Sequence, residues 1–346
     1  MLLTPKLKSR SFQILKNQKT PAIRQEEYME KDIILKRFFS DNERYADLIN
    51  GIGFNGEQIV CEGDLQELDS NSGIWNTYEK IVKYIKHNYG AKTRDILRKA
   101  AFGINFAVIG IENQEEIDYS IPLRIMSYDI GEYEKQAAKI RKKVRKKKRG
   151  LKSGEYLYGF EKDSRLNPVI TFLLYYGTEE WDGPTDLHGM IDFEDILKNL
   201  RSMTHNYHIN LIEIRKLADT SIFQTDIRQV FDVIRYSKDA KRLQELVQTD
   251  PYYQEMEEDA FDVIATYTNA EELIRVKELH RNEGGINMCE AITALIEEGK
   301  MEGIEQGEAR LALLNRKLFA DNRITDLQRV LEDTEYRKEL YKEYDI

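Results

Sequence analysis

Hydrophobic residues form their clearest pattern between residues 94 and 114, where the chain reads RDILRKAAFGINFAVIGIENQ. Residues 106–111 are a short, continuous apolar run, which is typical of a strand buried on both faces. Gly103 separates this run from the one before it, at a point where a tight turn needs a residue that tolerates positive φ. The pattern predicts a β-hairpin that turns at Gly103 and Ile104 and pairs residues whose numbers add up to 207.

This register brings acids together at the open end of the predicted hairpin. Asp95 would lie directly opposite Glu112, with Cβ atoms roughly 5 Å apart, and the two-residue period of a strand puts Gln114 on the same face. Two buried carboxylates repel each other unless a cation neutralises them. Because these side chains offer only oxygen atoms, the cluster favours Mg²⁺, or another hard cation such as Mn²⁺, over zinc. The spacing is loose, and chance acids at a solvated strand end are the alternative.

Helical spacing precedes the hairpin. The apolar residues of segment 27–39 predict one helix, and SDNERYADLING, residues 40–51, predicts a second helix that ends at Gly51. Ser40 and Glu43 have the spacing of a capping box.

After the hairpin, the pattern predicts one long helix and one further strand, and only helices after that. Pro122 opens a long predicted helix, since proline suits a first helical turn. Residues 167–177, NPVITFLLYYG, read as another buried strand, and from Phe193 on the pattern is helical. Glycines that recur every four residues on the last helix would let a second helix approach closely, or are a drifting repeat: Gly299, Gly303 and Gly307.

Charge is divided unevenly along the chain. The net charge is −9, but residues 1–170 carry +7 (31 Lys and Arg against 24 Asp and Glu) and residues 171–346 carry −16 (21 against 37). Residues 139–152 hold ten Lys and Arg in 14 positions, and so many like charges repel one another unless a polyanion binds them. The segment is either a solvated charge run or a contact for nucleic-acid phosphates. Its candidate DNA-binding residues are Lys142, Lys143, Arg145, Lys146, Lys147, Lys148 and Arg149.

Several motifs taken together resemble a known family. They are RDIL, GIENQ, PLRIMSYD, NPVITFLLYYG, WDGP and the final RKELYKEYDI. The combination is similar to the Rpn family of recombination-promoting nucleases and putative transposases, within the PD-(D/E)XK nuclease superfamily. The resemblance implies an α/β fold of the restriction-endonuclease type, with a mixed central sheet flanked by helices, followed by an all-helical C-terminal domain.

The resemblance also implies roles for single residues. Asp95 and Glu112 would bind the metal, and Asp47, on the helix ahead of the hairpin, would be a further acid near it; a surface position is the alternative. Arg124, in the first turn of the long helix, would approach a phosphate or form an ion pair with a nearby acid. Gln114 stands where the superfamily usually has Lys, so it would orient the attacking water without adding a positive charge.

We therefore expect a loose leader over residues 1–26, a PD-(D/E)XK-type nuclease domain over residues 27–215 and a helical domain over residues 216–346. The expected function is Mg²⁺-dependent cleavage of DNA by an endonuclease that acts in recombination, in a mobile element or in defence. The alternative is a catalytically weak DNA-binding or assembly module with a partner surface on its C-terminal helices. Those helices are also the expected surface of any homo-oligomer.

The cysteines, the histidines and the length of the apolar runs indicate neither a disulfide framework, nor a zinc site, nor a membrane span. Cys61 and Cys289 are far apart without metal-ligand spacing, which suits a reducing cytoplasm. No apolar run approaches the roughly 20 residues that span a bilayer, and the N-terminus lacks the apolar core of a signal peptide, so no membrane partner is expected. Without a cysteine or another ligand beside them, we expect three histidines to be ordinary surface residues: His188, His205 and His208.

Overall fold

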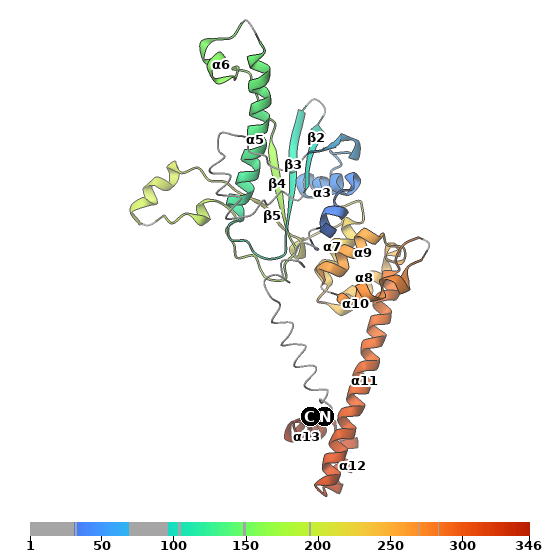
Figure 1. Ribbon diagram of the computed structural model, residues 1–346. Coiled ribbons are helices and arrows are strands. Elements are labelled where there is room, and N and C mark those ends of the chain that lie inside the picture. The colour runs from blue at the N-terminus through green and yellow to red at the C-terminus, as the bar shows by residue number, and fades with distance from the viewer. Residues whose placement is uncertain are drawn as a thin grey trace, which may run out of the picture.

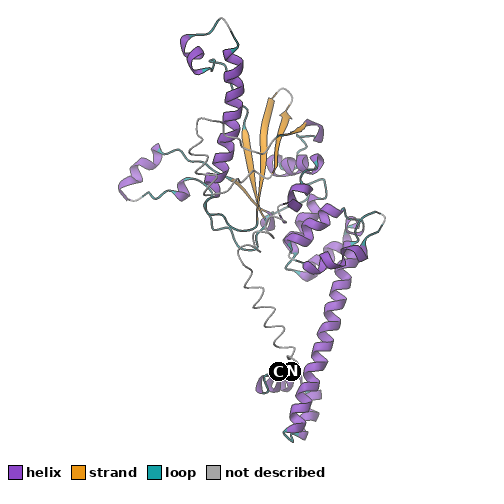
Figure 2. Ribbon diagram, in the orientation of Figure 1, coloured by secondary structure: helices purple, strands orange, loops and turns teal. Residues whose placement is uncertain are grey.

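The computed structural model describes residues 31, 33–68, 96–102, 105–147, 150–193, 195–268, 270–282 and 284–346. Its centre is a five-stranded sheet in the order β1-β2-β3-β4-β5, with helices on both faces (Figures 1 and 2). The strands are β1 (Leu65–Glu67), β2 (Ile96–Phe102), β3 (Asn105–Gln114), β4 (Val169–Tyr175) and β5 (Asn210–Glu213).

The β2–β3 hairpin has the predicted register. Its pairs run from Ile96 with Ile111 to Phe102 with Asn105, so the paired numbers add up to 207 throughout. β1 is antiparallel to β2, whereas β3, β4 and β5 are mutually parallel. The sheet is therefore mixed, and the predicted fold class is confirmed. The turn residues 103 and 104 lie outside the described residues.

The helix α3 (Asn42–Phe54) begins one residue later than a Ser40 cap would place it. The carboxylate of Asp41 accepts the backbone N–H of Arg44 at 3.0 Å and caps the helix, while the Ser40 hydroxyl donates to the carbonyl oxygen of Arg37 at 2.6 Å. The predicted capping box between Ser40 and Glu43 is therefore wrong, because the neighbouring aspartate takes the cap position.

The sequence predicted that this helix ends at Gly51, and that prediction is wrong. α3 continues to Phe54 and is closed by Asn55 in the left-handed conformation, φ 52°. A Cβ atom at Gly51 would lie 2.3 Å from the ring of Phe223. The glycine thus serves close packing against the chain ahead of α7 (Ile227–Tyr236) rather than termination.

Two helices cover opposite faces of the sheet. On one face, Tyr45 of α3 donates its hydroxyl to the carbonyl oxygen of Ile109 at 2.8 Å. On the other, α5 (Ile121–Arg145) packs Ile121 and Ile125 against Leu173. Pro122 stands in the first turn of α5, as predicted.

The last turns of α5 extend beyond the sheet. Gln136 exchanges hydrogen bonds with the backbone of Asn167, just before β4 begins, at 2.7 and 3.3 Å. The remaining turns therefore lie past the start of that strand, and α6 (Ser153–Tyr158) lies beside their end (Figure 1).

After β5 the described chain is mainly helical, and the hydrophobic core of α7 to α10 is continuous with that of the sheet. The core under α3 includes Ile109 and Phe172 of the sheet, Phe231 of α7 and Phe261 of α9. The predicted domain boundary after residue 215 thus falls between elements that share one core. The remaining helices are η1 (Glu62–Asp64), η2 (His188–Met190), η3 (Asp195–Met203), η4 (Ile214–Lys216), α8 (Ala240–Thr249), η5 (Pro251–Gln254), α9 (Glu258–Tyr267), α10 (Glu271–Val276), η6 (Lys277–His280), α11 (Met288–Ala320), α12 (Ile324–Glu332) and α13 (Thr334–Glu343).

α11 links this body to a small bundle at the C-terminus (Figure 1). Leu314 and Leu318 of α11 form a separate hydrophobic cluster with Val330 of α12 and Leu340 of α13. Between the two ends, residues 297–310 are exposed on every side. Nothing lies within 4 Å of where a Cβ would stand on the three glycines of this stretch, so close approach of a second helix there stays a prediction. No described helix is long and apolar enough to cross a membrane.

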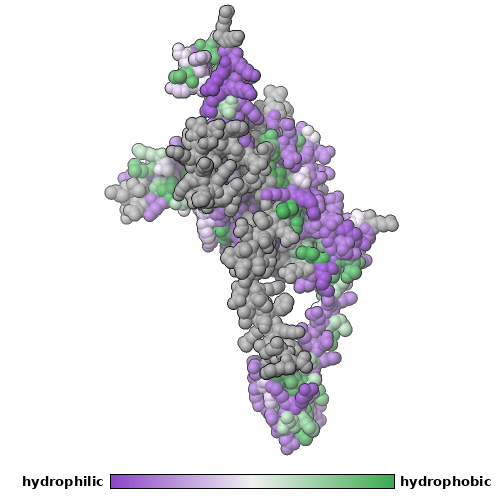
Figure 3. All heavy atoms as spheres, viewed as in Figure 1, coloured by the Kyte–Doolittle hydropathy of each residue, from purple (hydrophilic) through white to green (hydrophobic). Residues whose placement is uncertain are grey.

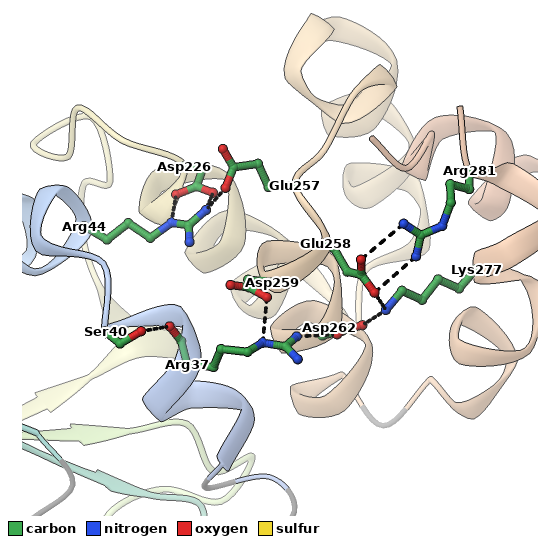
Figure 4. A network of polar contacts seen from close by, with 10 residues as sticks. All are labelled: Arg37, Ser40, Arg44, Asp226, Glu257, Glu258, Asp259, Asp262, Lys277 and Arg281. Carbon is green, nitrogen blue, oxygen red and sulfur yellow. Dashed lines mark hydrogen bonds and ion pairs between the residues drawn. The ribbon is translucent and has the colours of Figure 1, made fainter. Parts of the chain in front are cut away.

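A buried arginine ties α3 to the helices that follow the sheet (Figure 4). The guanidinium of Arg44 binds both carboxylate oxygens of Asp226 at 2.7 and 2.8 Å and one oxygen of Glu257 at 2.5 Å. Tyr252 also donates its hydroxyl to Asp226 at 2.7 Å. Arg37 makes comparable ion pairs at the surface, with a side chain that is 49% exposed against 8% for Arg44.

We expect Arg44→Met to lower the free energy of unfolding by about 3 kcal/mol, because it leaves the Asp226 charge buried without its guanidinium. Arg37→Met is the matched control, and it should cost less than about 1 kcal/mol because solvent screens an exposed ion pair. Urea denaturation of the two variants gives both values. Equal losses would show that Arg44 does not join the two regions.

Candidate functional site

The candidate site lies at the C-terminal end of β3, where three consecutive polar side chains are buried. Glu112 is 4% exposed, and Asn113 and Gln114 are each 5% exposed. Glu112 lies opposite Leu173 in the parallel register with β4, and Gln114 lies opposite Tyr175. Because Leu173 packs under α5, Glu112 and Gln114 also face α5. The period of two that predicted a shared face for them is confirmed.

Arg124, in the first turn of α5, binds Glu112. Its Nη2 lies 2.9 Å from Oε1 of Glu112, and its Nη1 lies 2.9 Å from Oδ2 of Asp118. Asp118 is held in turn by Ser120, whose N–H and hydroxyl donate to its Oδ1 at 2.8 and 2.6 Å. The ion pair with a nearby acid, one of the two roles considered for Arg124, is therefore present. Asp118 was not singled out from the sequence, although an Asp two residues before Ser120 is typical of a local turn.

Asp129 of α5 is a second buried acid near the sheet, and the sequence did not single it out. Its carboxylate accepts the hydroxyl of Thr171 at 2.6 Å and the hydroxyl of Tyr207 in a short hydrogen bond. Ile121, Ile125 and Asp129 follow one another at intervals of four, so they share the sheet-facing side of α5. An acid in an otherwise apolar stripe could have revealed this position, since a buried carboxylate needs hydrogen-bond partners.

Asp47 is directed away from this group. Both of its carboxylate oxygens accept the N–H of Gln224 at 2.9 Å, and Oδ2 also accepts the N–H and hydroxyl of Thr225 at 2.7 and 2.6 Å. It therefore fixes the chain just before α7. Since α3 packs on the face of the sheet opposite α5, the structure does not bring Asp47 together with Glu112.

Replacement of Asp47 by Ala should lower the free energy of unfolding by about 2 kcal/mol, because the hydrogen bonds to a charged acceptor are lost. Metal affinity should not change, since the carboxylate is already committed to residues 224 and 225. Thermal unfolding and a Mn²⁺ titration of the same variant separate the two roles. A stable variant with weakened metal binding would restore Asp47 to the metal site.

The donors described at the site fit a hard cation in part. The carboxylate of Glu112 and the amide oxygen of Gln114 are oxygen ligands of the kind that Mg²⁺ prefers. Among the residues that the structure describes, no three His, Cys, Asp or Glu side chains are grouped to hold a metal. Asp95, the predicted second carboxylate, lies outside those residues, so its place opposite Glu112 stays a prediction from the observed register.

The histidines take ordinary polar contacts. His188 Nε2 lies 2.8 Å from the carbonyl oxygen of Thr204, and His208 lies 3.4 Å from Asp186 at the surface. His205 is exposed. These contacts agree with the surface role predicted for them.

A cavity of about 280 Å³ opens beside the site, at the C-terminal ends of β4 and β5. Tyr175, which lies opposite Gln114, forms part of its wall together with Glu179, Glu180 and Glu213. Burial, with the nearby charge of Glu179, raises the pKa of Tyr175. Two basic residues, Arg215 and Lys216, also line the cavity. Lys216 pairs with Glu180 and Glu213 at 3.0 Å, so the charges of this wall largely offset one another.

The basic run is split between α5 and the chain that follows it. The helix ends at Arg145, where the negative end of the helix dipole favours basic residues. Lys147 pairs with Glu161 at 2.6 Å. Lys148 and Arg149 lie outside the described residues. The candidate DNA-binding residues that are exposed are Lys142, Lys143, Arg145, Lys146 and Lys147.

Comparison with known proteins identifies a family. The family model described as putative transposase, YhgA-like, matches residues 29–259. The matched segment includes the hairpin, α5, and the helices up to the start of α9. Neither the curated proteins nor the solved structures contain a match to this chain.

Proposed function

We propose, because this chain belongs to the family of YhgA-like putative transposases, that it is a metal-dependent DNA endonuclease. The family lies within the Rpn and PD-(D/E)XK-like group and indicates a nuclease-like or transposition-related function. The observation that supports the finer proposal is the buried pair Glu112 and Gln114, which share one face at the end of the hairpin. A buried carboxylate is costly in free energy unless it is paired, and Arg124 neutralises Glu112. The pair supports the proposal because its carboxylate and amide oxygens are ligands that a hard cation prefers.

Each residue of the site has a role in this proposal. Asp95 and Glu112 would hold Mg²⁺, which when bound makes a water molecule nucleophilic towards phosphorus. Gln114 would accept or donate a hydrogen bond to that water and so orient it. Arg124 keeps the Glu112 carboxylate in position, and its guanidinium fork suits a phosphate as well as a carboxylate.

The exposed basic residues at the end of α5 would hold the DNA backbone. Contacts to phosphate position DNA without reading its sequence. Changing four of them to Gln should therefore weaken binding about equally for unrelated DNA sequences. The slope of log K against log salt should become shallower by up to about 0.9 per lost contact. The four are Lys142, Lys143, Arg145 and Lys146.

The matched control removes the same charges elsewhere. Three lysines and one arginine that are exposed on α11 and α13 should leave the salt slope unchanged when they become Gln: Lys300, Arg316, Lys338 and Lys342. Fluorescence anisotropy over a salt series measures both sets. If the control set changes the slope as much as the α5 set, the DNA backbone does not lie along the end of α5.

The activity itself is tested by incubating supercoiled plasmid with the full chain in Mg²⁺ and in EDTA. Nicking that occurs in Mg²⁺ and not in EDTA supports the proposal. DNA binding without nicking favours the alternative, a catalytically weak DNA-binding or assembly module. Two observations favour that alternative. Gln114 stands where the PD-(D/E)XK superfamily usually has a lysine, and Arg124 already forms an ion pair with Glu112.

A further inference from the structure

The end of α5 and α6 form a projection, which we call the tip, residues 139–147 and 150–162. It lies beyond the start of β4 and away from the α11 bundle (Figure 1). Its exposed surface combines two kinds of side chain. The α5 end is hydrophilic, and hydrophobic atoms lie beside it at α6 (Figure 3). The hydrophobic and aromatic side chains are Tyr156, Leu157 and Tyr158, which are 72, 69 and 71% exposed.

Local contacts hold α6 in place. The carboxylate of Glu155 accepts the backbone N–H groups of Lys152 and Lys162 at 2.9 and 3.1 Å. Gly159 ends the helix at φ 70°, and a Cβ there would lie 3.2 Å from the side chain of Arg141. Arg141 also lies over the ring of Phe160, 5.5 Å from its centre. The two tyrosines are therefore presented on an anchored helix and not on a loose loop.

Exposed aromatic rings beside a strongly basic segment match one kind of partner. Proteins that bind single-stranded nucleic acid combine a positive surface for the backbone with aromatic side chains on which bases stack. Bases in a duplex are stacked on each other and do not offer their faces. We propose that the tip binds DNA with unpaired bases, with Tyr156 and Tyr158 stacking on the bases and the basic residues of α5 holding the phosphates.

This inference rests on the proposed function for the identity of the polyanion, but it does not depend on catalysis. α5 rises about 1.5 Å per residue, so Arg145 lies about 32 Å along the helix from Arg124. Binding at the tip can therefore be measured in EDTA, which withholds the metal from the candidate site. Nicking and tip binding can then succeed or fail separately.

The test compares an oligothymidylate with an abasic strand of the same length, which keeps the phosphates and lacks the bases. The full chain should bind the oligothymidylate roughly tenfold more tightly, since stacking on the rings adds to the phosphate contacts. Changing Tyr156 and Tyr158 together to Ala should reduce binding of the oligothymidylate to that of the abasic strand. Changing both to Phe should keep the difference, because a ring without its hydroxyl still stacks.

Two controls complete the experiment. Phe319→Ala removes another aromatic ring that is 70% exposed, far along α11, and should change neither affinity. The substitution of basic residues by Gln should weaken binding of both strands alike. Equal affinities of the full chain for the two strands would overturn the proposal, as would an unchanged ratio in the double Ala variant. Tyrosine-dependent binding to vesicles of anionic phospholipid that exceeds binding to the oligothymidylate would assign the tip to a membrane surface instead.

Discussion

Arg124→Met is expected to lower the free energy of unfolding by about 5 kcal/mol in metal-free buffer, at the upper end of the cost of breaking a buried ion pair. The variant keeps the Glu112 carboxylate, which is 4% exposed, and removes the guanidinium that lies 2.9 Å from it. Asp118 loses the same partner. Urea denaturation in EDTA measures the loss. Arg141→Met is the control on the same helix, and its half-exposed ion pair with Glu134 should be worth less than about 1 kcal/mol.

A second substitution separates the ion pair from general packing. Arg124→Met combined with Glu112→Gln should recover most of the lost stability, since the deeply buried Glu112 charge is then removed. Asp118 is less buried and keeps its hydrogen bonds from Ser120. Mg²⁺ should also stabilise the single variant by binding the folded state, and it should not stabilise the double variant. If the losses of the two single variants simply add, Arg124 and Glu112 do not act as a pair.

Metal affinity should fall by at least about 100-fold in Glu112→Gln, because even partners that only orient a metal ligand commonly cost 10 to 100-fold when lost. Asp95→Ala should have an effect of the same size if it is the second ligand. Glu116→Gln removes a carboxylate four residues further along at an exposed position, and it should bind metal like the wild type. Calorimetric titration with Mn²⁺ gives the three affinities. Unchanged affinity in Glu112→Gln would exclude this carboxylate as a ligand.

The sequence was sufficient for the parts of the fold that depend on neighbouring residues. The position of Gly103 between two apolar runs in the sequence predicted the hairpin register, and the period of two predicted that Glu112 and Gln114 share one face; the described pairs agree with both. Pro122 correctly indicated the first turn of α5. These features follow from turn geometry and strand alternation, which act over a few residues.

Contacts between distant segments could not be predicted in this way. The partners of Asp47 are 177 and 178 residues away in the sequence, and no local pattern connects them. The packing of Gly51 on Phe223 is also a tertiary contact, and it was mistaken for a helix stop. Arg124 had two open roles because a guanidinium suits a phosphate and a carboxylate alike, and only the fold shows that Glu112 lies within its reach.

The central claim is that the end of β3 carries a metal-dependent nuclease site. It is tested most directly by the nicking rate of supercoiled plasmid over a Mg²⁺ series. The rate is measured for the wild type and for Glu112→Gln at a temperature at which both proteins are fully folded. We predict a rate that rises with Mg²⁺ and saturates for the wild type, and nicking no faster than in EDTA for the variant. Equal nicking by the two proteins at saturating Mg²⁺, above the rate in EDTA, would show that the cleavage site lies elsewhere.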